Sequence, residues 1–124
     1  MTKDSKAHGT DRRPKRGIGM RHAINGILHL YSVCGNVRIH TAAAIAAAAA
    51  GWISGLSAAE WGVVALCIGT VMAAETFNTA IETLADRVVP QHDEAIKHVK
   101  DMAAGAVLIT ATAALVAGIV IFMS

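Results

Sequence analysis

The sequence has few aromatic residues and long stretches that carry no charge. Only 4% of its 124 residues are aromatic and 16% are charged, whereas 54% are hydrophobic and the mean hydropathy is +0.48. No acidic residue occurs between positions 17 and 55, and no charged residue occurs between positions 61 and 74. A soluble domain of this length is rarely so apolar, and it mixes apolar with charged residues throughout. The composition therefore excludes an ordinary soluble domain and favours a membrane protein.

Cysteine and net charge are also scarce. The two cysteines lie in different settings, Cys34 in a basic polar segment and Cys67 in an apolar run, which does not indicate a disulfide framework. A net charge of +2 is too small to predict a nucleic-acid partner, and we expect none. Eight of the eleven Lys and Arg residues lie before position 39, and this clustering suits anionic lipid headgroups.

The N-terminal third is predicted to lie outside the membrane core. Residues 1–16 are basic and polar and are expected to form a disordered tail, with no apolar core of a cleaved signal peptide after it. Residues 17–33 are predicted to form an amphipathic helix in the membrane interface, too short and polar to span. A peripheral anchor is favoured for this helix over a lid that admits lipid. Its apolar face consists of Met20, Ala23, Ile24, Ile27, Leu28 and Tyr31.

Three membrane-spanning helices are predicted after the surface helix, at about residues 39–56, 58–87 and 101–123. The expected fold is thus an all-α integral membrane protein in which residues 17–124 form one membrane domain. Ser57 and Glu60 have the spacing of a helix capping box, so Glu60 is expected to be a cap rather than a catalytic acid. Lys and Arg flank the N-terminus and the connection between the second and third spans, which predicts a cytoplasmic N-terminus.

The second predicted span ends in polar residues that share one face. At about 100° per residue, Glu75, Asn78, Glu82 and Asp86 fall within an arc of about 80° that extends roughly 16 Å along the helix. Ionisable groups at or near the bilayer are costly and are a default indication of function. We therefore take this acidic stripe, defined by these four residues, as the candidate site.

The acidic stripe suits phosphoryl transfer. Carboxylates can bind Mg²⁺ through oxygen, and the lysine in Lys100-Asp101 can hold phosphate oxygens at the same boundary. Two other readings stay open. In the first, Asp86-Arg87 and Lys100-Asp101 simply end one helix and begin the next; in the second, Glu75 serves a small proton-coupled transporter. No Walker-type glycine loop is present, which excludes a soluble nucleotide-binding fold.

Several segments resemble the prokaryotic diacylglycerol kinase family, which includes undecaprenol kinases. They are Glu75-Thr-Phe-Asn78-Thr-Ala-Ile-Glu82 with Asp86-Arg87, then Lys100-Asp101-Met-Ala-Ala-Gly105, and upstream Asn25-Gly26 and Asn36-Val-Arg38-Ile-His40. The resemblance extends from about Arg16 to the C-terminus. It implies an ATP-dependent lipid kinase in the bacterial inner membrane, with one surface helix and three spans, assembled as a homotrimer with composite active sites.

The resemblance also implies roles for individual residues. Glu75 would be the catalytic base that deprotonates the hydroxyl of the membrane lipid substrate, either diacylglycerol or a polyprenol. Glu82 would bind the Mg²⁺ of Mg-ATP. Four further residues would support or contact the nucleotide: Asn78, Asp86, Lys100 and Asp101.

Cys34 departs from the family pattern. A glutamate that shares metal binding commonly occupies this position, and a thiol is a poor ligand for Mg²⁺. Either Glu82 functions with phosphates and waters alone, or the chain is a catalytically impaired family member that acts as a membrane binding or assembly subunit. Cys34 is expected to be a packing residue rather than a redox group.

Overall fold

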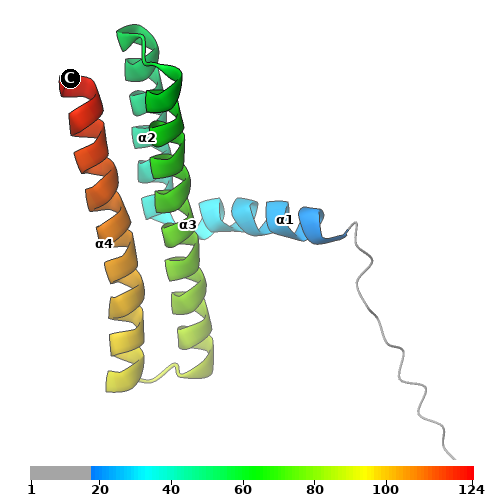
Figure 1. Cartoon of the computed structure of the whole chain (residues 1–124). Helices are drawn as coiled ribbons and strands as arrows, with labels where there is room; N and C mark the ends of the chain where they lie inside the picture. Colours follow the sequence, from blue (N-terminus) through cyan, green and yellow to red (C-terminus); the bar gives the residue numbers. More distant parts are fainter. Residues whose placement is uncertain (1–17) are drawn as a thin grey trace, which may run out of the picture.

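The computed structural model describes residues 18–124 as four helices and their short connections (Figure 1). The helices are α1 (Ile18–Val33), α2 (Gly35–Ser54), α3 (Ala58–Val88) and α4 (Glu94–Met123). Helices α2, α3 and α4 are each long and apolar enough to cross a membrane. The predicted all-helical fold with three spans is therefore confirmed. The predicted tail at residues 1–16 lies outside the described part of the chain, and the homotrimer stays a prediction.

Helices α3 and α4 form a long antiparallel hairpin, and α2 packs beside α3 (Figure 1). Helix α3 has 31 residues and is therefore about 46 Å long, longer than a hydrocarbon core of about 30 Å. Helix α1 runs across the direction of the other three and meets them part of the way along α3 (Figure 1). The connected ends of α3 and α4 extend past the level of α1 (Figure 1).

The position of α1 indicates where the membrane surface lies. Its apolar residues Met20, Ile24 and Leu28 are at least half exposed, so no part of the described chain covers them. An amphipathic helix with an uncovered apolar face lies in the membrane interface, with that face toward the acyl chains. On that placement, we expect the ends of α3 and α4 that extend past α1 to lie on the aqueous side.

The connection between α2 and α3 is tight because of two glycines. Gly55 has a φ of +69°, and its N–H donates to the carbonyl of Gly51 at 3.0 Å, which ends α2. The next helix starts with the predicted capping box. The Glu60 N–H donates to Ser57 Oγ at 3.2 Å, and the Ser57 N–H donates to Glu60 Oε1 at 3.3 Å. The prediction that Glu60 is a cap is confirmed.

Two helices begin earlier than the sequence predicted. Helix α2 starts at Gly35, whereas the predicted span starts at about residue 39. Helix α4 starts at Glu94, because the Asp93 side chain accepts the Ile96 N–H at 3.0 Å and so caps the first turn. The polar first turns of α4 are thus helical, which places Lys97, Lys100 and Asp101 on a regular surface.

Gly51 gives a first prediction. A Cβ at this position would lie 2.8 Å from Leu56 Cδ1 and 3.0 Å from the Trp61 ring. Leu56 can move, but the ring is rigid, so we expect Gly51→Ala to lower the free energy of unfolding by about 1 kcal/mol, measured by thermal unfolding in detergent. Gly62→Ala is the matched control, since no atom lies within 4 Å of its added Cβ, and it should leave stability unchanged or raised. Equal effects of the two changes would contradict this packing.

Candidate functional site

The corner between α1 and α2 forms one wall of the candidate site. Thr41 donates from Oγ1 to the Val37 carbonyl at 2.8 Å, so the Tyr31 hydroxyl is the donor in its 2.6 Å bond to Thr41 Oγ1. Arg38 Nε donates to the Tyr31 carbonyl at 3.1 Å. Beneath these bonds, Leu30 and Val37 are buried. The corner is therefore held in one geometry against α3.

Glu75 is the most deeply buried ionisable side chain in the described part of the protein. It lies about 26 Å along α3 from the start of that helix and is 1% exposed. His40 Nε2 on α2 lies 3.0 Å from Glu75 Oε1. The other oxygen, Oε2, is buried with no hydrogen-bond partner among the described residues. Such a group costs folding free energy and calls for an explanation.

Asn78 lies one turn further along α3, on the same face as Glu75. Its Oδ1 is also buried without a partner in the described part of the chain. Two buried oxygen acceptors, one turn apart on α3, thus lack a hydrogen-bond partner among the described residues. A ligand that brings hydrogen-bond donors or a cation would satisfy them.

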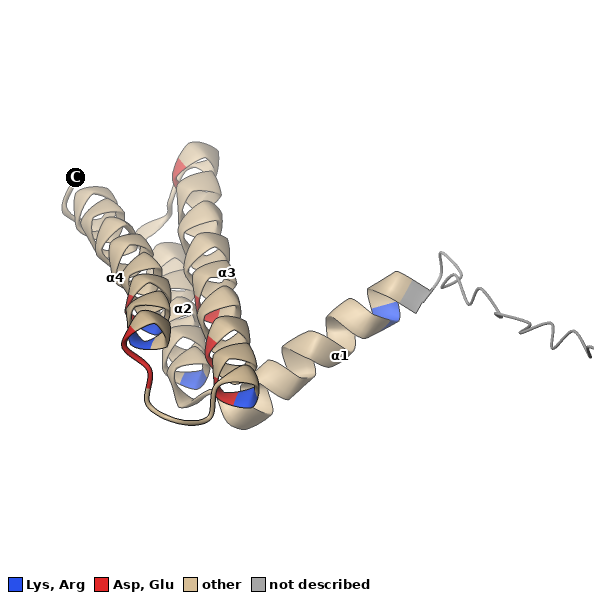
Figure 2. Ribbon diagram, turned by 90° about the horizontal axis from the view of Figure 1, so that it is seen from below, with Lys and Arg blue, Asp and Glu red and all other residues tan. Residues whose placement is uncertain are grey.

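The rest of the acidic stripe lies nearer the connected ends of α3 and α4, which we expect to lie on the aqueous side. Glu82 and Asp86 are exposed. Asp86 Oδ1 accepts from Lys100 Nζ of α4, whereas Glu82 forms no hydrogen bond or ion pair with any described residue. Asp101 is bound to Lys97 Nζ at 2.7 Å, one turn back on its own helix. Figure 2 shows charged residues of both signs at this end of the hairpin.

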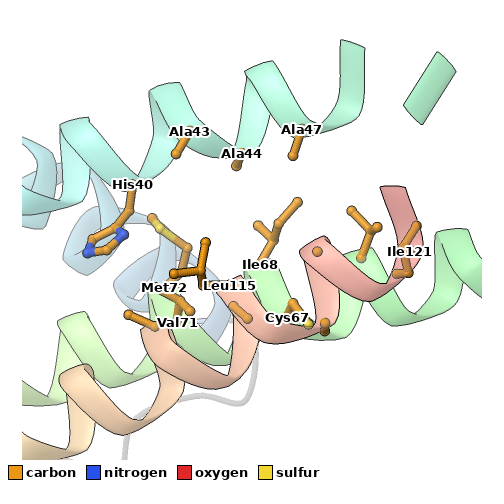
Figure 3. Close-up of a pocket in the computed structure, with 15 residues that line it drawn as sticks. His40, Ala43, Ala44, Ala47, Cys67, Ile68, Val71, Met72, Leu115 and Ile121 are labelled. Atoms are coloured by element: carbon orange, nitrogen blue, oxygen red, sulfur yellow. The ribbon is translucent and has the colours of Figure 1, made fainter. Parts of the chain in front are cut away.

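Two hollows lie on opposite sides of the Glu75 level. A polar hollow of about 370 Å³ is lined by Asp86, Lys97, Lys100 and Asp101 together with the connection to α4. An apolar cavity of about 310 Å³ lies among α2, α3 and α4, within the spanning part of the bundle (Figure 3). Much of its wall is formed by small side chains, and His40 lies at one end of it (Figure 3). These small residues include Ala43, Ala44, Ala47, Ala111, Ala114 and Gly118.

The structure brings most of the sequence-predicted site together. Because α3 is unbroken from Ala58 to Val88, the four residues of the acidic stripe share one face as expected. Lys100 joins the stripe through Asp86, but Asp101 bonds to Lys97. The site predicted from the sequence did not include His40, which the structure places beside Glu75. A histidine at the start of a long apolar run was the available signal.

A preformed metal cage is absent from the described residues. No three His, Cys, Asp or Glu side chains among residues 18–124 are grouped so that they could hold an ion. Cys34 lies at the N-cap of α2, makes no side-chain capping bond and is a free thiol. Glu82 is an exposed carboxylate with no ion-pair partner in the part of the chain that the structure describes, which suits an ion that arrives with phosphates and keeps much of its water.

These features define a multi-pass helical membrane protein with a polar site where its longest helices leave the bilayer. The sequence model of the family "Prokaryotic diacylglycerol kinase" matches residues 21–122. The undecaprenol kinase of Bacillus subtilis is 37% identical over 102 residues, which are 82% of this chain and 83% of that protein. The diacylglycerol kinase of Synechocystis sp. is 38% identical over 106 residues, which are 85% of this chain and 61% of that protein. No solved structure matches the chain.

The chain therefore belongs to the prokaryotic diacylglycerol kinase family, and it is a lipid kinase. The family match extends from α1 to nearly the end of α4, so it includes every residue of the acidic stripe. The resemblance inferred from the sequence is confirmed.

The ion pair between Lys100 and Asp86 gives a second prediction. Its side chains are 33% and 65% exposed, and pairs in this setting are worth about 0–1 kcal/mol. We expect Lys100→Met and Asp86→Asn each to lower stability by no more than about 1 kcal/mol, so that any loss of activity reflects the site and not folding. Thermal unfolding of both single variants and the double variant measures this. A coupling free energy well above 1 kcal/mol would show that the pair is structural.

Proposed function

We propose that the protein transfers the γ-phosphate of ATP to the hydroxyl of diacylglycerol or a polyprenol, at the cytoplasmic face of the bacterial inner membrane. One observation carries the proposal: Glu75 is buried with one oxygen that lacks a partner among the described residues, while Lys100 and the exposed carboxylates lie toward the connected end of the α3–α4 hairpin. We expect the membrane boundary to lie between them. A lipid hydroxyl approaches from the bilayer and a nucleotide approaches from water, so this boundary is where the two can meet.

Glu75 acts as the general base. Its Oε2 accepts the proton as the hydroxyl oxygen attacks the γ-phosphorus, and the bond from that phosphorus to the bridging oxygen breaks to release ADP. A base held in place in this way contributes about 10²–10⁴-fold to the rate. Burial keeps competing water away from the attacking oxygen, which favours transfer to lipid over hydrolysis of ATP.

The aqueous part of the site binds the nucleotide. Lys100 can exchange its bond to Asp86 for one to a phosphate oxygen, and Asn78 and Asp101 lie on the two helices that flank this position. Glu82 would hold Mg²⁺ together with the phosphates, and the ion supplies neutralisation of phosphate charge. Positioning and charge neutralisation carry most of the catalysis in phosphoryl transfer.

The apolar cavity supports a lipid as the acceptor. Its wall of small side chains offers a smooth surface for a hydrocarbon chain, and its His40 end adjoins Glu75. The names of the two relatives, undecaprenol kinase and diacylglycerol kinase, support the two candidate lipids equally. A homotrimer would let neighbouring chains complete the site, and it would cover part of the exposed apolar surface of α2–α4.

A direct assay tests the function. Purified protein in detergent receives Mg-ATP labelled in the γ-phosphate, with diacylglycerol or undecaprenol in parallel samples. Labelled phospholipid is expected with at least one of the two lipids. Absence of product with both lipids, in protein shown to be trimeric, would overturn the proposal.

A third prediction separates the roles of two carboxylates. Glu75→Gln is expected to lower kcat by at least about 10²-fold with little change in Mg-ATP affinity, since a base is needed only when the hydroxyl attacks. Glu82→Gln is expected to weaken Mg-ATP binding itself. Equilibrium binding and turnover are measured for both variants. Equal loss of nucleotide binding in the two would contradict this division.

Cys34 gives a fourth prediction. Because Mg²⁺ needs only one or two protein carboxylates, Glu82 is sufficient, and we expect Cys34→Glu to change kcat by less than about tenfold. Cys34→Ser serves as the control for loss of the thiol. A much larger gain for the glutamate variant alone would instead favour a native chain that is impaired at its metal site and acts as a binding or assembly subunit.

A further inference from the structure

The pair formed by His40 and Glu75 extends the proposed function, on which this inference rests. We propose that His40 is a positioning residue that holds one carboxylate oxygen of Glu75, so that the other oxygen faces the lipid hydroxyl. The two side chains come from different helices, α2 and α3, and their contact is 3.0 Å between Nε2 and Oε1.

The direction of this hydrogen bond follows from its chemistry. As a general base, Glu75 acts in its ionised form, and an ionised carboxylate only accepts hydrogen bonds. Nε2 of His40 therefore carries a hydrogen and donates a hydrogen bond to Oε1. Oε2 is left buried and unpartnered among the described residues, as the atom that can take a proton from the substrate. A carboxylate without this bond could rotate and exchange its two oxygens, and the acceptor would no longer point in one direction.

The surroundings argue against a merely structural pair. A structural partner would be expected to satisfy a buried acid completely, yet one of the two oxygens stays unsatisfied. The His40 side chain is 28% exposed, against 2% for that of Glu75, and it also lines the end of the apolar cavity. His40 therefore lines one end of the cavity that suits a lipid chain (Figure 3) and also contacts the carboxylate that suits its hydroxyl.

Helix α2 is well suited to hold His40 in place. The tight corner with α1 fixes its first turn through the Thr41, Val37 and Tyr31 bonds, immediately beside His40 in the sequence. The position of the imidazole is thus set by the fold and not by the substrate. Such prior placement matters because a misplacement of about 1 Å can cost about 10²-fold in rate.

Steady-state kinetics with the better of the two lipids test the proposal. His40→Ala is expected to lower kcat by about 10- to 100-fold while the KM values for lipid and ATP change less than threefold. His40→Gln retains an N–H donor of similar reach and is expected to recover a substantial part of kcat. Added imidazole should raise the rate of the alanine variant but not that of the wild type. His22→Ala, a change at an exposed histidine of α1, is the control and should be silent.

A double variant shows whether His40 acts through Glu75. In a Glu75→Gln background, His40→Ala should change the residual kcat by less than twofold, because the group that it positions is gone. Additive losses would overturn the proposal. A His40→Ala variant with the full wild-type kcat would also overturn it. A loss of kcat that neither imidazole nor His40→Gln restores, together with a lower Tm, would show a structural role for His40 and would overturn the proposal as well.

A measurement without turnover separates this inference from the proposed function. Nitrogen chemical shifts of the His40 ring in ¹⁵N-histidine-labelled protein should change on Glu75→Gln and stay constant on Glu82→Gln. If the wild type phosphorylates neither lipid but these shifts respond, the pair exists and only the proposed function falls. Unchanged shifts on Glu75→Gln would contradict the pair itself.

Discussion

Glu75 is an ionisable side chain that the fold removes from water while one of its oxygens lacks a partner among the described residues. This arrangement lowers stability, and much of the surrounding structure maintains it. The α1–α2 corner covers α3 at this level, and His40 holds the second oxygen. Buried apolar residues such as Val37 stabilise the packing of this corner. A site that is costly to the fold and supported from two helices is consistent with a catalytic group.

Helix length organises the rest of the site. Helices α3 and α4 are longer than the bilayer core requires, and α1 meets α3 part of the way along it. The hairpin is thereby divided into a spanning part with an apolar cavity and an aqueous part with Lys100 and the exposed carboxylates. Glu75 lies between the two. In the proposed function, a lipid from the bilayer and a nucleotide from water can then reach the same side chains without any large movement of the helices.

The sequence predicted what depends on local periodicity. Apolar runs gave three spans, the 3.6-residue repeat gave the acidic stripe, and the Ser57–Glu60 spacing gave a capping box that the structure confirms. It did not predict contacts between helices. The His40–Glu75 pair joins residues far apart in the chain. The ion pair of Asp101 with Lys97 depends on α4 starting at Glu94, because both residues then lie on one helix. The Asp93 side chain sets this start by capping the first turn, and a hydropathy pattern does not reveal such a cap.

The central claim is that α3 leaves the bilayer near Glu75. Its most direct test is the accessibility of spin labels on cysteines placed at Leu66, Phe77 and Leu84, which are exposed side chains along α3, with Cys34 and Cys67 replaced by serine. Oxygen, which partitions into lipid, should enhance the spin relaxation of the label at position 66 most strongly. A water-soluble nickel chelate should enhance the relaxation of the label at position 84 most strongly. The two effects should be about equal near position 77. A label at position 84 that only oxygen reaches, or one at position 66 that the chelate reaches, would contradict the account.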